Sequence, residues 1–344
     1  MTKKRKSGSV LLTDVAERAG VSISTVSNVL NGRKRFSSKT QTKVEKAIAD
    51  LNYMTDKAAS SLRSAKQWTI SFLIRDTASE FLSDAVTAGI TAGLSEVLNE
   101  HGYDLQIKLC ADKVVNINEV FRRRSTDALI VTSSGTPTEL KQVFKTVSQL
   151  GVPMVLVKHK YSDAFEDLAI VDQKDDEAGR MIVEHLIARN ARRFWFISNK
   201  TRWHTIESRF AGVKKALSSL AVDSEMHLIR SETERFKDTR DAVAAFAETN
   251  DPPDAIIGGN DSLAIAAMHA MRERGLNPPT DILVAGFNGL DAASYAYPSL
   301  TTVVSPVKEI GREAGLLALK RLENGEFPIR KTVFPYILRL GEST

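Results

Sequence analysis

The sequence has few of the features on which disulfides, metal sites and membrane anchors depend. Its 344 residues include one cysteine, Cys110, which excludes an intramolecular disulfide and a cysteine-cluster zinc site. That cysteine ends a strand-like run, LQIKLC, where a buried thiol is expected. No apolar run approaches the roughly 18 residues of a membrane span, and the basic start MTKKRKSGSV lacks the apolar core of a secretory signal. We therefore expect a cytoplasmic protein without metal or cofactor.

Signatures of catalysis are also missing. A dinucleotide-binding enzyme would carry GxGxxG after a strand, and IIGGND at residues 256–261 lacks that spacing. The six histidines form no HExxH motif, and His159, His185 and His204 are expected on helix surfaces or in a cleft. No set of nucleophile, base and orienting residue is evident. The sequence therefore predicts that the protein is not an enzyme.

Positive charge is concentrated at the N-terminus. Residues 1–66 hold 14 Lys or Arg and 5 Asp or Glu, a net of 14 − 5 = +9, whereas the whole chain is +5. The remaining residues therefore carry +5 − 9 = −4. This asymmetry predicts a small head that meets a polyanion and a body that does not.

Two short helices are predicted in this basic head. Thr13 and Asp14 are residue types that cap helices, so the first helix is expected to begin there. Gly20 supplies the positive φ of a tight turn. Ser22 caps the second helix, whose apolar residues recur at spacings of three and four: Val26, Val29 and Leu30. The pattern indicates a helix-turn-helix, whose second helix enters the major groove of DNA; an ordinary surface hairpin is the alternative.

From Trp68 onward, apolar strand-like runs alternate with amphipathic helical stretches. The runs are TISFLI, YDLQIKL, DALIVTS, PMVLVK, RFWFIS, DAIIGG and DILVAGF. Alternating strands and helices predict parallel sheets, and sheets buried on both faces explain why the runs are continuously apolar. Two groups of such units predict two lobes with a cleft between them. Ligands of such sheets bind at the carboxyl ends of strands, here after Ile74, Ser133, Val157, Ile197, Gly259 and Phe287.

On these residues the chain resembles the lactose-repressor and galactose-repressor family of bacterial transcription factors. The head matches at DVAERAGVSISTVSNVLN and VEKAIADLNY. The body matches more loosely at GVPMVLV, EAGRMIVEHLIARNARRFWFI, SRFAG, IIGGNDSLAIAAMHAMRERGL, ILVAGFNGLD and PSLTTV. Together these segments cover nearly the whole chain.

The resemblance implies an all-α helix-turn-helix head and an α/β body of two lobes like those of periplasmic sugar-binding proteins. We expect the DNA-binding head at 1–54, a hinge helix and linker at 55–66, and an effector-binding and dimerisation domain at 67–344. Its N-lobe would comprise about 67–167 and 298–327, and its C-lobe about 168–297 and 328–344. The helices at 81–98 and 264–274 would form the dimer interface.

The function implied is a DNA-binding repressor whose homodimer binds a pseudo-palindromic operator and whose affinity a small effector controls. Effector between the lobes would change their relative angle and, with it, the separation of the two hinges. A solute-binding protein of the same body fold that does not bind DNA is the alternative, against which the basic head and the missing signal peptide argue.

The resemblance also implies the DNA contacts. Ile23, Ser24 and Asn28 would meet base edges, and the full expected set is Leu12, Thr13, Ser22, Ile23, Ser24, Thr25, Asn28, Ser37, Ala59 and Leu62. Relatives often carry Arg at the position of Asn28, and an amide there favours adenine over guanine. The hinge would fold on operator and insert Leu62 into the minor groove, although Thr55 replaces a usual proline. Packing of Leu62 on Trp68 in a plain linker is the alternative.

The expected effector site departs from the family pattern. Lys158 and Asn288 stand where sugar-binding members tend to carry Asp, and Glu207 stands where Arg is frequent. An ammonium and an amide reverse the polarity that carboxylates offer to sugar hydroxyls, so we expect a sugar derivative that is anionic or of mixed charge. The candidate residues are Arg75, Lys158, Trp203, Glu207, Arg209, Phe236, Asn260 and Asn288. Four have plain structural alternatives: a solvated Lys158, an internal ion pair of Arg209, a core Phe236 and a loop-covering Trp203.

Overall fold

The computed structural model divides the chain into two compact units, Met1–Gln67 and Trp68–Thr344. It describes residues 10–30, 36–53, 66–75, 85–110, 125–133, 135–159, 167–200, 203–220 and 223–344. The division agrees with a body that begins near residue 67. The predicted hinge, with Ala59 and Leu62, lies outside the described residues except for Lys66.

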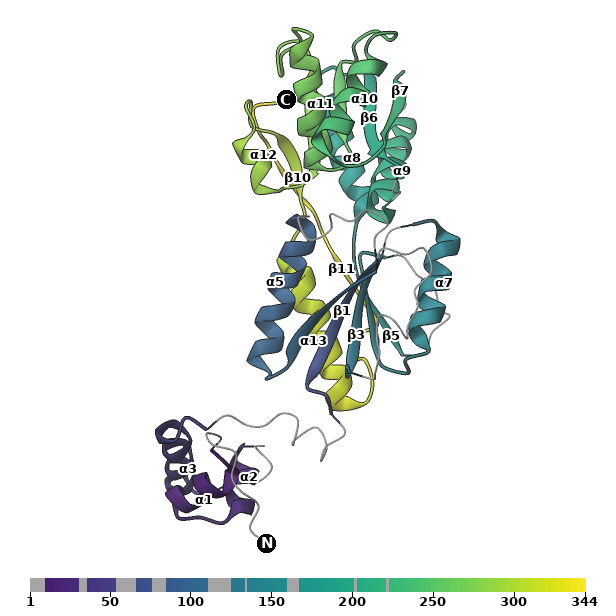
Figure 1. The fold of residues 1–344 in the computed structure, drawn as a ribbon. Coiled ribbons are helices and arrows are strands. Elements are labelled where there is room, and N and C mark those ends of the chain that lie inside the picture. Colours follow the sequence, from purple (N-terminus) through teal and green to yellow (C-terminus); the bar gives the residue numbers. More distant parts are fainter. Residues whose placement is uncertain are drawn as a thin grey trace. The chain divides into compact units, whose positions relative to one another are not determined.

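The first unit is a small helical bundle made of α1 (Leu12–Ala19), α2 (Ile23–Leu30) and α3 (Ser38–Asp50) (Figure 1). Six buried side chains form its core: Val15, Ala16, Ala19, Val26, Val44 and Ala47. The turn between α1 and α2 contains Gly20 at φ 66°, as predicted. The first helix begins one residue earlier than predicted, because the Asp14 carboxylate reaches back to accept the N–H of Leu11 at 2.8 Å.

The second unit begins with a six-stranded parallel sheet of order β11-β5-β4-β3-β1-β2. Its strands are β1 (Thr69–Arg75), β2 (Asp104–Cys110), β3 (Ala128–Ser133), β4 (Met154–Val157), β5 (Leu168–Gln173) and β11 (Lys331–Phe334). On one face lie α5 (Ala85–Glu100) and α13 (Val307–Asn324), and on the other lies α7 (Pro137–Ser148) (Figure 1). Alternate residues of each central strand point to opposite helices, which explains the continuous apolar runs. Cys110 is buried at the end of β2, as expected.

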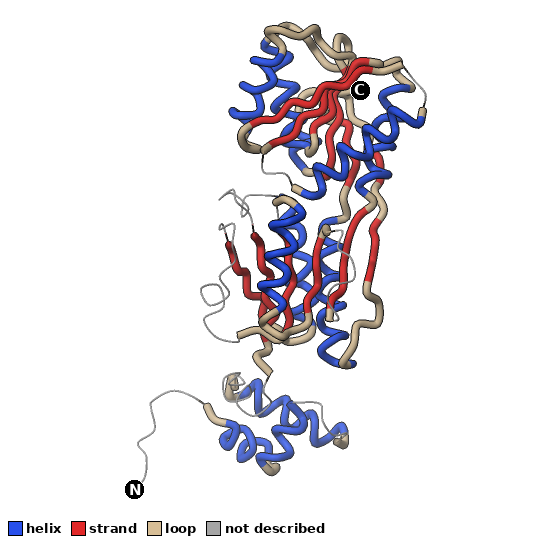
Figure 2. Tube along the Cα trace, turned by 90° about the vertical axis from the view of Figure 1, so that its right-hand side faces the viewer, coloured by secondary structure: helices blue, strands red, loops and turns tan. Residues whose placement is uncertain are grey.

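A second six-stranded sheet has the order β12-β10-β9-β8-β6-β7. Its strands are β6 (Arg193–Asn199), β7 (Glu225–Ser231), β8 (Ala255–Gly258), β9 (Leu283–Asn288), β10 (Thr301–Val304) and the antiparallel edge strand β12 (Ile337–Arg339). The helices are α8 (Asp175–Ile187), α9 (His204–Ser219), α10 (Phe236–Phe246), α11 (Asp261–Glu273) and α12 (Asp291–Tyr295). Figure 2 shows the two sheets as separate groups of strands, each flanked by helices.

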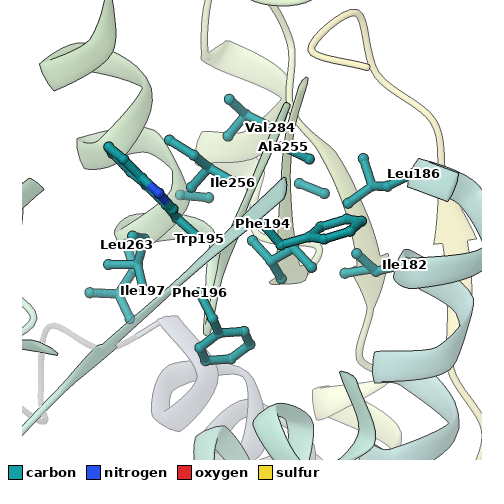
Figure 3. Packing of buried hydrophobic residues seen from close by; sticks show 14 of the residues in the cluster. Ile182, Leu186, Phe194, Trp195, Phe196, Ile197, Ala255, Ile256, Leu263 and Val284 are labelled. Carbon is teal, nitrogen blue, oxygen red and sulfur yellow. The ribbon is translucent and has the colours of Figure 1, made fainter. Parts of the chain in front are cut away.

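The core of this second lobe is built around β6, whose aromatic residues alternate between the two faces (Figure 3). Phe194 points toward Ile182 and Leu186 of α8. Trp195 points the other way, where its ring meets Phe246 of α10 edge-on, 5.0 Å between centroids. The helices α8 and α9 therefore cover one face, and α10 and α11 cover the other.

The chain crosses between the two sheets three times, and each crossing lies one strand later than the sequence suggested. The strands β5 and β11 belong to the first sheet, and β10 belongs to the second. The expected breaks near 167, 297 and 327 were therefore too early, and the crossings fall at 174, 305–306 and 335–336. Sheet membership depends on pairing with distant strands, such as Lys331 beside Ile170, which the local pattern does not encode.

Candidate functional site

The N-terminal end of α2, the second helix of the head, exposes both polar and apolar side chains. Ile23 is 49% exposed and Ser24 is exposed, whereas Thr25 and Asn28 are partly buried. Val26 is fully buried. The Ser22 hydroxyl accepts the N–H of Thr25 at 3.1 Å, so Ser22 caps α2 as predicted. Of the four residues expected to face outward, Ile23 and Ser24 do so, whereas Thr25 and Asn28 are only partly exposed. The helix end offers the side-chain types that read base edges and phosphates.

The remaining described residues of the expected DNA surface lie on the other two helices. Thr13 is exposed on the first turn of α1, while Leu12 is partly buried and packs against the head core. Ser37 caps α3, accepting the N–H of Thr40 at 3.3 Å. An exposed ion pair between Arg18 and Asp50, 2.9 Å apart, ties α1 to α3.

In the body, the carboxyl ends of the parallel strands carry buried polar side chains. In the first sheet these are Arg75, Ser133, Lys158, Asp172 and Gln173, and in the second they are Asn199, Ser231, Asn260 and Asn288. Lys158 lies directly after β4, at φ 59°, and its N–H donates to Val171 O at 2.8 Å. The carboxyl edge of a parallel sheet is where ligands of such folds bind. Lys158 is 7% exposed, which contradicts the alternative of a solvated loop charge.

Two histidines connect these edges. His159 follows Lys158 in the first lobe, and its ring stacks on that of His204, the first residue of α9, with 6.0 Å between centroids and 22° between planes. His159 Nε2 accepts the N–H of Ser133 at 3.0 Å. Burial, reinforced by His204, lowers the pKa of His159 to about 3, so this ring is neutral near pH 7. Their contact shows that the carboxyl edges of both sheets face the same space.

Arg209 is held in a buried cluster, which we call the Arg209 cluster. Its guanidinium donates to Asp175 Oδ1 at 3.2 Å, Gly259 O at 2.9 Å, Asn288 Oδ1 at 2.8 Å and Tyr336 Oη at 3.0 Å. Tyr336 in turn donates to Asp175 Oδ1 at 2.6 Å. Burial raises the pKa of the Tyr336 phenol well above its usual value, so the hydroxyl stays protonated as this bond requires.

This cluster decides between two roles for Arg209. An arginine has five N–H donors, and four of them are used within the chain. The internal ion pair with Asp175, the structural alternative in the sequence, is therefore confirmed. Asn288 is expected to contact the effector, but its side-chain oxygen accepts a hydrogen bond from the same guanidinium. Both residues shape the edge of the second sheet, and a direct contact between either one and a ligand stays a prediction.

A second cluster, the amide–carboxylate cluster, consists of Asn199, Glu234 and Asn260. Asn199 Nδ2 donates to Glu234 Oε1 at 2.5 Å, and Asn260 Nδ2 donates to Glu234 Oε2 at 2.8 Å. Asn260 also caps α11, because its Oδ1 accepts the N–H of Leu263 at 2.9 Å. Three strand ends of the second sheet, those of β6, β7 and β8, are joined in this way.

Two further residues predicted to bind the effector, Glu207 and Arg75, lie against other side chains or backbone of the protein. Glu207 forms an ion pair with Arg230 at 2.9 Å. Arg75 is fully buried; a Cβ on Gly135 would lie 2.7 Å from its Nη1 and 2.9 Å from Glu139 Oε2, so both side chains lie against this glycine.

The two aromatic candidates occupy the starts of helices. Trp203 precedes α9 and packs partly buried against the second-lobe core. Phe236 is 46% exposed, and its ring meets His269 of α11 edge-on at 5.1 Å. The exposure of Phe236 contradicts the core alternative, and a role in stacking against a sugar ring stays a prediction.

Four residues of the two clusters were not predicted: Asp175, Asn199, Glu234 and Tyr336. Asn199 could have been found, because it directly follows the strand-like run RFWFIS. Asp175 and Tyr336 are separated by about half the chain, and only the two crossings bring them together. Within the described residues, no group of three or more His, Cys, Asp or Glu could hold a metal ion. No described helix is both long enough and apolar enough to span a bilayer.

Comparison with known proteins agrees with both units. Residues 11–56 match the family described as bacterial regulatory proteins, lacI family, and residues 183–344 match the periplasmic binding protein-like domain. Catabolite control protein A of Staphylococcus xylosus is 26% identical, covering 97% of this chain and 99% of its own. The ribose operon repressor of Halalkalibacterium halodurans is 27% identical over 97% and 96%.

Solved structures show the same fold. The lac repressor bound to ONPG in its repressed state superposes with a TM-score of 0.79 at 23% identity, covering 98% of this chain and 100% of that one. A complex of the regulator CelR with cellobiose gives 0.71 at 23% identity, over 97% and 100%. The helix-turn-helix head and the two-lobe body define a DNA-binding transcriptional regulator. The chain carries a lacI-family DNA-binding domain followed by a periplasmic binding protein-like domain.

Proposed function

We propose that this regulator is a cytoplasmic repressor, without catalytic activity, whose homodimer binds a pseudo-palindromic operator under control of a small sugar-like effector. The observation that carries the proposal is the α2 surface: Ile23 and Ser24 are exposed while Val26 locks the helix into the head. The net charge of +9 on residues 1–66 adds attraction for phosphates. Relatives named as repressors support the direction of control.

The effector would bind at the facing carboxyl edges of the two sheets. Relatives of this fold have been solved with cellobiose and with ribose, which supports a sugar or sugar derivative. Lys158, buried at the edge of the first sheet, would attract an anionic group on that ligand. Effector would then bias the angle between the lobes through the three crossings.

The crossings are already linked to one another, which supports coupling through them. Gln173 at the first crossing donates from Nε2 to the Ser305 hydroxyl at the second, at 2.8 Å. Asp175, beside the first crossing, accepts a hydrogen bond from the hydroxyl of Tyr336 at the third crossing. A change of backbone conformation at one crossing would therefore strain the hydrogen bonds that link it to another crossing.

The proposal is tested by selecting binding sites for the purified full-length protein from a random DNA pool. We expect two inverted half-sites, with affinity that falls steeply as salt rises because phosphate contacts release counterions. Selection with Asn28→Arg should change the preferred base at one symmetric pair of positions, from adenine toward guanine. Failure to enrich any site would favour a solute-binding protein that does not bind DNA, and an unchanged base preference would remove Asn28 from the contacts.

A further inference from the structure

The amide–carboxylate cluster fixes the direction of two amide groups. A carboxylate only accepts hydrogen bonds, so Asn199 and Asn260 must both turn their nitrogens toward Glu234 and their oxygens away from it. The Asn260 oxygen then accepts the N–H of Leu263 at 2.9 Å. The Asn199 oxygen lies on the side of its amide group that faces away from the Glu234 carboxylate.

No described residue gives that oxygen a hydrogen-bond partner. Asn199 is fully buried, and its Oδ1 is one of three buried side-chain oxygens in the described structure without a partner. A buried acceptor left unpaired costs about 1–3 kcal/mol, and proteins retain few of them without a functional reason. A donor supplied from outside the chain would remove this cost.

The position of Asn199 indicates where such a donor would come from. Asn199 is the last residue of β6, at the carboxyl edge where ligands of parallel sheets bind. The next helix, α9, begins with His204, whose ring stacks on His159 of the first lobe. The end of β6 therefore lies on the side of the second lobe that meets the first.

Two positive charges near Asn199, those of Arg230 and Lys200, are engaged in ion pairs. Arg230 donates to the main-chain oxygen of Asn199 at 3.0 Å and is paired with Glu207 at 2.9 Å. Lys200 is paired with Glu232. The end of β6 thus offers an acceptor oxygen beside a carboxylate, which is the chemistry that recognises hydrogen-bond donors.

We propose that Asn199 and Glu234 form the donor-recognising end of the effector site, which takes a hydroxyl or an ammonium group of the ligand. The ligand donates an O–H or N–H to Asn199 Oδ1, and Glu234 holds that amide in place and adds negative charge. This inference rests on the proposed function. With Lys158 on the opposite sheet, it defines a sugar derivative with a donor at one end and an anionic group at the other.

The test uses full-length protein and a matched set of compounds: glucose, 2-deoxyglucose, glucosamine, gluconate, and the 6-phosphates of glucose, 2-deoxyglucose and glucosamine. Affinities from calorimetry are compared for wild type, Asn199→Leu and Glu234→Gln. The control is Asn250→Leu, because the Asn250 amide donates only to the nearby Phe246 O and Thr249 in the described structure. We expect the best ligand to bind each cluster variant at least tenfold more weakly and the control equally well.

The compounds also separate the two kinds of donor. Preference for glucosamine compounds identifies an ammonium, and preference for glucose compounds over their 2-deoxy analogues identifies a hydroxyl. The loss of binding free energy from removing the donor on the ligand and the loss from removing the acceptor on the protein should not add, because both changes remove the same hydrogen bond. If Asn199→Leu does not fold, Glu234→Gln and the deoxy compounds give the same comparison.

Two results would overturn the proposal and can be told apart. Equal binding of the best ligand to wild type, Asn199→Leu and Glu234→Gln would remove these residues from the site and leave effector control standing. If no compound binds wild type or changes its operator affinity, both this inference and the sugar-effector proposal are wrong. Operator binding without ligand, measured for every variant, shows whether DNA recognition is intact.

Discussion

Arg209 illustrates how burial decides what a single residue does. Its position in the SRFAG segment suggested a ligand contact, yet the side chain is 1% exposed and bonded to Asp175, Gly259, Asn288 and Tyr336. A buried guanidinium needs such partners, because an unpaired charge in the interior costs several kcal/mol. Its first contribution is therefore to hold residues from distant parts of the chain in one place.

Tyr336→Phe tests the value of this arrangement. The change keeps the ring but removes the hydroxyl that donates to Asp175 and accepts from Arg209. We expect the free energy of unfolding to fall by about 1–3 kcal/mol, because two buried charged groups each lose a partner. Urea denaturation measures this loss. Tyr295→Phe is the control, since Tyr295 is 81% exposed, and equal stability of the two variants would contradict the importance of the cluster.

His159 should make stability depend on pH. Burial lowers the pKa of His159 from 6.5 to about 3 in the folded protein. Between those values the unfolded chain binds a proton that the folded chain does not, so stability falls as pH falls, by up to about 1.4 kcal/mol per pH unit. His159→Gln should remove this part of the dependence of stability on pH.

Asp261 contributes with the opposite sign, because burial raises its pKa to about 6. The quantity to measure is therefore the difference in stability between wild type and variant at each pH. The exposed His101, changed to Gln, is the control, and an identical slope in His159→Gln would show that this ring is not the cause.

At the scale of elements, α5 and α13 of the first lobe pack closely against each other. The helices approach through glycines: a Cβ on Gly93 would lie 2.0 Å from Lys308 O, and one on Gly311 would lie 2.1 Å from Ile90 O. Elsewhere the secondary structure follows the sequence pattern closely, because strands and helices here bury continuous or periodic apolar faces. The approach of these two helices is a tertiary feature, although each glycine was visible in the sequence.

Gly93→Ala distinguishes packing from helix propensity. Propensity alone predicts stabilisation by about 1 kcal/mol when glycine is replaced by alanine in a helix. The Cβ would instead meet backbone of α13, so we expect the free energy of unfolding to fall by about 1–3 kcal/mol, as in overpacked cores. Thermal and urea unfolding are compared with the exposed neighbour variant Ala92→Ser. A stabilised Gly93→Ala would show that the helices can separate at no cost.

For the whole molecule, three crossings of the chain connect the two lobes. Bonds from Gln173 to Ser305 and from Tyr336 to Asp175 link them, and the stacked rings of His159 and His204 join the sheet edges directly. A ligand between the edges would act on all of these contacts at once. Allosteric coupling between two ligand sites of a protein is typically about 1–3 kcal/mol.

Effector control should therefore appear as a change in operator affinity that depends on Lys158. An anionic sugar derivative present at 100 times its dissociation constant should stabilise the protein by about 2.7 kcal/mol and change operator affinity by roughly 5-fold to 150-fold. Lys158→Ala should abolish both effects. The control is Lys141→Ala, because Lys141 is exposed on α7, outside the strand ends and the crossings. If neutral sugars act equally on wild type and Lys158→Ala, the anionic class is wrong while sugar control stands.

The sequence alone determined the helix-turn-helix, the alternation of strands and helices, and the edges on which a ligand site could form. These follow from local rules: capping by Ser22, the turn at Gly20, and apolar periodicity. The structure alone decided which strands share a sheet, that Arg209 is paired internally, and that Tyr336 meets Asp175. Those facts depend on residues far apart in the chain, whose partners are chosen by burial and by the need to satisfy buried polar groups.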